Sequence, residues 1–172
     1  MRLQQDLRHY KNNIRKHSRL MQTTRILHQM SKGQEANFWN TIRQNLPKKC
    51  FATRIENVHG GGVPDVHFIW DGLPFWCELK VSKSNAVAIS AHQVAWNTAY
   101  WTRGGANFFL VKSLKERDLI LFDGDQGADL IQGGISAAQG SRFTNPASLF
   151  CALRPRLERR ISATLRPCGS AA

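Results

Sequence analysis

The chain has 172 residues, 42% of them hydrophobic, which is enough for one domain with a packed core and too few for two comfortable domains. No apolar run approaches the ~18–20 residues of a membrane span, and the N-terminus is too polar for a secretory signal peptide. These properties exclude a membrane-spanning protein and wholesale disorder, and they predict a soluble protein of the cytoplasm.

The net charge of +12 is concentrated at the two ends of the chain. Residues 1–32 carry eight Lys and Arg against one acid, and residues 151–172 carry five against one. Basic arms are typical of proteins that bind a polyanion, most often nucleic acid, although solubility alone is the alternative explanation. We therefore divide the chain into a basic extension (1–32), a core (33–123), a loop-rich part (124–150) and a basic tail (151–172).

The first clear element is an amphipathic helix over residues 34–46, which Pro47 ends. Glu35 begins the apolar face of this helix. An acid on the core side is costly unless a cation meets it, so Glu35 is a candidate functional residue.

The next elements alternate between strands and helices. Apolar and alternating runs predict strands over 51–57, 65–70, 75–81, 107–112 and 118–122. A helix begins at Ser90, where Ser90 and Gln93 fit a capping box, and two glycines end it. The order is α-β-β-β-α-β with a further strand. Beyond residue 122 we expect loops and one short helix that stops near Pro155.

The informative residues lie on the second and third strands. A turn at Asp71-Gly72 joins them, and either a two-residue or a four-residue loop places Asp65, Glu78 and Lys80 on one face of the sheet. The shorter loop sets Asp65 directly opposite Glu78. The longer loop sets it opposite Lys80.

Two carboxylates at this separation repel each other unless a cation sits between them. Hard oxygen ligands favour Mg²⁺ or Mn²⁺, and a lysine beside them can stabilise charge on a phosphate. This set fits phosphodiester hydrolysis by an activated water. The alternative is a solvated salt bridge on the sheet surface, which the otherwise apolar third strand makes less suitable.

The stretch Gly62-Val63-Pro64-Asp65-Val66, followed by Glu78-Leu79-Lys80, resembles the PD-(D/E)XK nuclease superfamily. The helix before it and the later Ser90-x-x-Gln93 make it most similar to the VRR-NUC family, whose small stand-alone members occur in phages and bacteria. The resemblance covers roughly residues 34–113. It implies an α/β fold of the restriction-endonuclease type, with an αβββαβ core and a mixed central sheet flanked by helices.

The resemblance also implies roles for individual residues. Asp65 and Glu78 would be metal ligands, with the Leu79 carbonyl as a further ligand, and Lys80 would be the catalytic lysine. Glu35 matches an acid that the family carries on its first helix, and this acid would also serve the metal.

Two assignments stay open at this point. Gln93 matches a glutamine of the family's second helix, but the capping box alone also accounts for it. Glu56, on the strand before the glycine loop, rivals Glu35 as the additional acid.

Among other residues, His59, His67 and His92 are weaker candidates. Trp96, Tyr100 and Trp101 are candidates for stacking on bases or for a dimer contact, although packing is the better default at helical spacing. The dimer prediction takes Trp96 and Tyr100 as exposed.

The resemblance therefore implies a Mg²⁺- or Mn²⁺-dependent DNA endonuclease. Its size and basic ends suggest a homodimer that acts on branched DNA such as Holliday junctions. The alternatives are a homing or restriction-like enzyme that cuts duplex DNA and a DNA-binding module without catalysis. No nucleotide cofactor is expected, because the glycine run lacks a Walker lysine.

Overall fold

The computed structural model describes residues 33–55 and 61–165, and the remaining residues are outside the described part. The chain divides into two compact units, Met1–Ala36 and Asn37–Ala172. The sheet and the helices α2 to α4 belong to the second unit.

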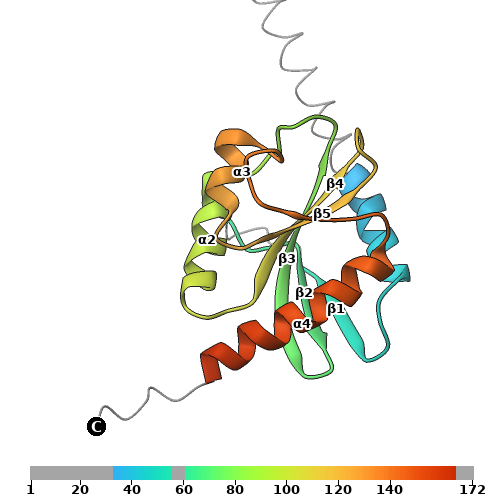
Figure 1. Cartoon of the computed structure of the whole chain (residues 1–172), viewed down its shortest axis with the longest axis vertical. Helices are drawn as coiled ribbons and strands as arrows, with labels where there is room; N and C mark the ends of the chain where they lie inside the picture. Colours follow the sequence, from blue (N-terminus) through green and yellow to red (C-terminus); the bar gives the residue numbers. More distant parts are fainter. Residues whose placement is uncertain (1–32, 56–60, 166–172) are drawn as a thin grey trace, which may run out of the picture. The chain divides into compact units, whose positions relative to one another are not determined.

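A helix over residues 33–44 comes first in the described part, which agrees with the predicted helix that Pro47 ends. The elements that follow are β1 (Cys50–Arg54), β2 (Val66–Trp70), β3 (Leu73–Ser82), α2 (Ala91–Thr102), β4 (Asn107–Ser113), β5 (Leu119–Asp123), α3 (Gly127–Gly133), β6 (Ser141–Phe143) and α4 (Pro146–Leu165) (Figure 1).

The strands of the described part form one six-stranded sheet in the order β1-β2-β3-β4-β5-β6. Strands β3 and β4 are parallel and α2 connects them, whereas the other neighbours are antiparallel. A parallel pair needs such a crossover, while antiparallel strands can be joined by short turns. The predicted α-β-β-β-α-β order and the mixed α/β sheet are confirmed.

One face of the sheet packs against α4 and against the helix that precedes β1. Leu149, Leu153 and Leu157 of α4 and Phe38 and Ile42 of that helix are buried in this cluster. The strands contribute alternate residues, which are Val66, Phe68, Phe75, Cys77, Leu79, Phe108 and Leu110. Because successive side chains of a strand point to opposite faces, the residues between them belong to the other face.

The other face is covered by α2 and α3, which Figure 1 shows on the side of the sheet opposite α4. Phe109, Val111 and Ile120 pack there with Leu130 of α3. Nearer β1, this face carries Glu78 and Lys80, so polar and apolar residues share the layer beneath the helices.

The β2–β3 hairpin has the two-residue loop. Trp70 pairs with Leu73, so Asp71 and Gly72 alone make the turn. Both have positive φ, 49° and 82°, as a type I′ turn requires. This turn sets the register of every pair along the hairpin, and it selects the shorter of the two predicted loops.

The C-terminal third is more regular than the sequence predicts. Helix α3 and strand β6 occupy part of the stretch expected to be loops. Helix α4 does not stop near Pro155 but continues to Leu165, so that prediction was wrong. No helix in the described ranges combines the length and apolar character that a membrane span needs.

Tertiary contacts explain why α4 passes through a proline. Pro155 removes one main-chain hydrogen bond, which alone disfavours a helix. Beyond it, Leu157 is fully buried, and the Arg160 guanidinium donates to the Gly105 and Trp101 carbonyls. Thr164 donates to the Gly104 carbonyl at 3.0 Å. These contacts outweigh the local preference.

Replacement of Leu157 tests this arrangement. Leu157→Ala should lower the free energy of unfolding by about 2–5 kcal/mol, since it removes a fully buried leucine from the core. Urea denaturation would measure the change. Ser162→Ala, at an exposed position of the same helix, is the matched control and should change stability by less than about 0.5 kcal/mol. Equal effects would contradict a docked C-terminal half of α4.

Candidate active site

The hairpin register brings the three motif residues together. Asp65 directly precedes β2, and because Val66 pairs with Cys77, the next position along the register is Asp65 opposite Glu78. Lys80 lies two residues after Glu78 on the same face of β3. The prediction that Asp65, Glu78 and Lys80 lie on one face of the sheet is confirmed.

Glu78 is the most buried of these residues, with 0% of its surface exposed. Its Oε1 accepts from Lys80 Nζ at 2.8 Å and from Gln93 Nε2 at 2.5 Å. Its Oε2 is also buried but accepts no hydrogen bond from any residue that the structure describes. Both donors therefore hold one oxygen and leave the other without a partner within the described part.

Asp65 is half-buried and contacts the backbone of β3. Its Oδ2 accepts from the Leu79 amide at 2.8 Å. The N–H and C=O of one strand residue project to the same side of the strand. The Leu79 carbonyl therefore faces the side on which Asp65 lies, as a third oxygen near the two carboxylates.

Gln93 both caps α2 and contacts Glu78. Its Oε1 accepts from the Ser90 amide at 3.0 Å, and Ser90 Oγ accepts from the Gln93 amide at 3.2 Å, which completes a capping box. The Nε2 of the same side chain donates to Glu78. Capping thus fixes the orientation of the amide and directs its NH₂ group at the carboxylate.

The glycine loop approaches the first turn of α2 closely. Gly62 has a φ of +98°, and a Cβ at this position would lie 2.3 Å from the His92 carbonyl oxygen. Only glycine satisfies both conditions. The loop that leads into Asp65 therefore rests against the helix that carries Gln93. The side chain of His92 is exposed.

Burial raises the pKa of Glu78 to about 8. Loss of water around the carboxylate is the largest cause, Lys80 opposes the shift, and the nearby Asp65 carboxylate adds to it. Glu78 consequently holds a proton near neutral pH until a cation compensates its charge.

The donor set fits a hard divalent cation. Asp65 and Glu78 supply carboxylate oxygens, the buried Glu78 Oε2 lacks a partner among the described residues, and the Leu79 carbonyl faces the same side. Oxygen ligands of this kind suit Mg²⁺ or Mn²⁺, which keep several waters when bound. The described residues contain no cluster of three or more His, Cys, Asp or Glu suited to a metal.

The roles of the two candidates for an additional acid stay predictions. Glu35 is half-buried on the helix over residues 33–44 and belongs to the unit Met1–Ala36. Its role beside Asp65 and Glu78 remains a prediction. Glu56 and His59 lie outside the described residues.

The aromatic residues of α2, Trp96, Tyr100 and Trp101, are half-buried, so they are partly packed and partly exposed. Trp96 stacks on Tyr100, with ring centroids 4.9 Å apart, and contacts Trp76 of β3 edge-on at 5.7 Å. Trp76 also contacts His67 of β2 at 4.6 Å. Sequence reasoning missed Trp76, although its place two residues before Glu78 predicts the same face.

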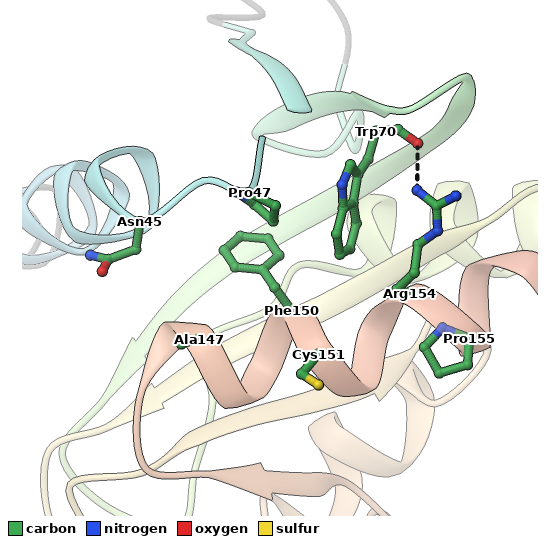
Figure 2. A pocket seen from close by; sticks show the side chains of 8 residues that line it. All are labelled: Asn45, Pro47, Trp70, Ala147, Phe150, Cys151, Arg154 and Pro155. Carbon is green, nitrogen blue, oxygen red and sulfur yellow. Dashed lines mark hydrogen bonds between the residues drawn. The ribbon is translucent and has the colours of Figure 1, made fainter. Parts of the chain in front are cut away.

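A hollow of about 480 Å³ lies beside α4 (Figure 2). It is bordered by Trp70 at the end of β2, by Pro47 and by Phe150, Cys151 and Arg154 of α4. Arg154 lies over the Trp70 ring and donates to its carbonyl. Trp70 shares the face of Val66 and Phe68, so this hollow is separate from the acidic cluster.

No protein-family model matches the chain, and no curated protein is significantly similar to it in sequence.

The buried carboxyl makes stability depend on pH. The unfolded chain releases this proton near pH 4.5, whereas the folded chain holds it until about pH 8. Rising pH should therefore lower the free energy of unfolding across this interval, with a limiting slope of about 1.4 kcal/mol per pH unit. Urea denaturation in EDTA at pH 5.5 to 8.5 should show this loss for the wild type and a flatter profile for Glu78→Gln. If the wild type and Glu78→Gln lost stability with the same pH dependence, Glu78 would not be the buried acid that titrates in this range.

Proposed function

We propose that this protein is a metal-dependent DNA endonuclease that hydrolyses phosphodiester bonds in branched DNA. The observation that carries the proposal is the buried Glu78 carboxylate, which has one oxygen held by Lys80 and Gln93 and the other without a partner among the described residues. A structural salt bridge needs neither the adjacent Asp65 nor an orphaned buried oxygen, whereas a cation site uses both.

Each residue of the cluster has a distinct task in this proposal. Asp65 and Glu78 would hold Mg²⁺ or Mn²⁺ together with the Leu79 carbonyl. When bound, the cation supplies Lewis acidity and lowers the pKa of a coordinated water. Lys80 is placed to donate a hydrogen bond to that water or to a phosphate oxygen. Gln93 keeps the Glu78 carboxylate in one orientation.

Charge supports DNA as the substrate. The chain carries 24 Lys and Arg against 12 Asp and Glu, and the excess lies outside the nearly neutral middle. Such arms bind phosphates without reading sequence and suit DNA whose helices diverge from a branch. We further propose a homodimer, because paired incisions at a branch need two sites and a two-fold dimer supplies them.

The substrate class can be tested directly with matched DNAs. A four-way junction, a flap and a linear duplex of shared sequence would be incubated with the protein in Mg²⁺, Mn²⁺ or EDTA. Cleavage of the branched DNAs in either metal but not in EDTA is expected, and light scattering should give twice the chain mass. Equal cleavage of linear duplex would favour the homing or restriction-like alternative. Binding with no cleavage in any metal would favour a non-catalytic module.

Single substitutions should separate metal binding from chemistry. Asp65→Ala and Glu78→Ala should each abolish cleavage, since each removes a ligand, while DNA binding survives. Lys80→Ala should lower cleavage by at least about 10²-fold but leave Mn²⁺ binding measurable by calorimetry. Lys83→Ala, an exposed lysine just beyond it, is the matched control and should retain activity. Full activity of the Glu78 variant would remove the proposal.

The choice between the two further acids needs its own experiment. Glu35→Gln should lower cleavage by about 10²-fold if this acid serves the site, a loss typical of a positioned catalytic group. Glu56→Gln should then have the smaller effect. Cleavage rates at saturating metal would rank the two variants, and the reverse order would assign the role to Glu56.

A further inference from the structure

The site is bordered by a row of aromatic side chains, His67, Trp76, Trp96 and Tyr100, that the proposed chemistry does not use. Neighbouring ring centroids in this row are 4.6, 5.7 and 4.9 Å apart. We call these four residues the aromatic row. They come from three different elements, β2, β3 and α2.

Each of these elements carries at least one ring close to a residue of the site. His67 follows Asp65 by two residues on β2, and Trp76 precedes Glu78 by two on β3, which places each ring ~7 Å along the strand on the same face. On α2, Trp96 follows Gln93 by three residues and so lies on the same side of the helix. The aromatic row therefore lies beside the carboxylates, with neighbouring ring centroids 4.6 to 5.7 Å apart.

Packing alone does not account for the exposure of these rings. Phe75, Phe108 and Phe109 of the same sheet are fully buried, whereas all four residues of the row are half-buried. The open surface continues onto β1 and β2, where Phe51 and Ile69 pair across the strands and are 64% and 40% exposed. Ile69 shares the face of His67. This is a partly open, aromatic surface that begins at the cluster.

Resting on the proposed function, we propose that the aromatic row stacks unpaired nucleobases next to the bond that is cut. Among branched DNAs, those with single-stranded nucleotides at the branch, such as a flap or splayed arm, are then bound more tightly than a fully paired junction. Aromatic faces bind bases of any sequence, while the paired bases of a duplex have no free faces to offer. The chain's net charge of +12 complements the phosphates of such a strand.

Base stacking is tested by binding rather than by cleavage. The full-length protein in EDTA would be titrated with a fluorescein-labelled single-stranded oligodeoxythymidine and with an abasic oligonucleotide of equal length and charge. We expect the base-bearing strand to bind at least about 5-fold more tightly and to quench tryptophan fluorescence. Equal affinity for the two strands, or no binding of either, would overturn the inference.

Substitutions then locate the surface. Trp76→Leu and Trp96→Leu should each weaken binding of the base-bearing strand by about 5-fold or more, without changing affinity for the abasic strand. Trp70→Leu, in the hollow on the opposite face, is the matched control and should bind as the wild type does. Unchanged binding by both row variants would overturn the inference, as would loss of a dimer in those variants without loss of binding.

The two proposals fail separately. If the abasic strand binds as well as the base-bearing one while branched DNA is still cut in Mg²⁺, base stacking is wrong and the nuclease stands. If the row variants lose binding but no DNA is cut in any metal, the surface binds single strands and the nuclease is wrong.

Discussion

The structure depends on the burial of one carboxylate, that of Glu78, in the middle of an otherwise apolar strand. A buried acid must find donors, lose its charge or bind a cation. Here Lys80 and Gln93 donate to one oxygen, and burial raises the pKa of Glu78 although Lys80 opposes the shift. The surrounding elements follow from this: β3 needs a neighbouring lysine, and α2 needs a glutamine whose amide is fixed by the helix cap. A bound cation would compensate the remaining negative charge of the buried Glu78 carboxylate.

The position of the second carboxylate is set by a turn remote from it. Asp71 and Gly72 occupy the positive-φ positions of a two-residue loop, and the pairing runs without a bulge from that loop to the start of β2. A shift of one residue anywhere along the hairpin would move Asp65 to the opposite face. At the far end, the close contact of Gly62 with α2 fixes where the chain enters β2. The acidic pair thus depends on glycines at both ends of one hairpin strand.

Much of this could be predicted from the sequence, because the signals are local. The periodicity of the strands, the Asp71-Gly72 turn and the capping box of α2 each need only a few neighbouring residues, and the alternation of side chains then places Asp65, Glu78 and Lys80 on one face. The continuation of α4 through Pro155 could not be predicted, since it depends on contacts of Arg160 and Thr164 with carbonyls almost sixty residues earlier. The contact between Gln93 and Glu78 could not be predicted either. The helix cap at Gln93 is local, but its approach to Glu78 requires the packing of α2 on the sheet. Only part of the aromatic row could be predicted from the sequence, because its rings come from three separate elements.

The attachment of α4 has a consequence for the order in which the protein is assembled during synthesis. Helix α2 is fixed at its N-terminal end by residues already made when it emerges, namely the Gly62 loop and Glu78. Its C-terminal end is tied through the Trp101, Gly104 and Gly105 carbonyls to Arg160 and Thr164. On a ribosome these partners arrive some sixty residues later, so a nascent chain that already contains the whole acidic cluster still lacks the contacts that hold the C-terminal end of α2. The final turns of the last helix therefore complete the support of a centre encoded in the first half of the chain.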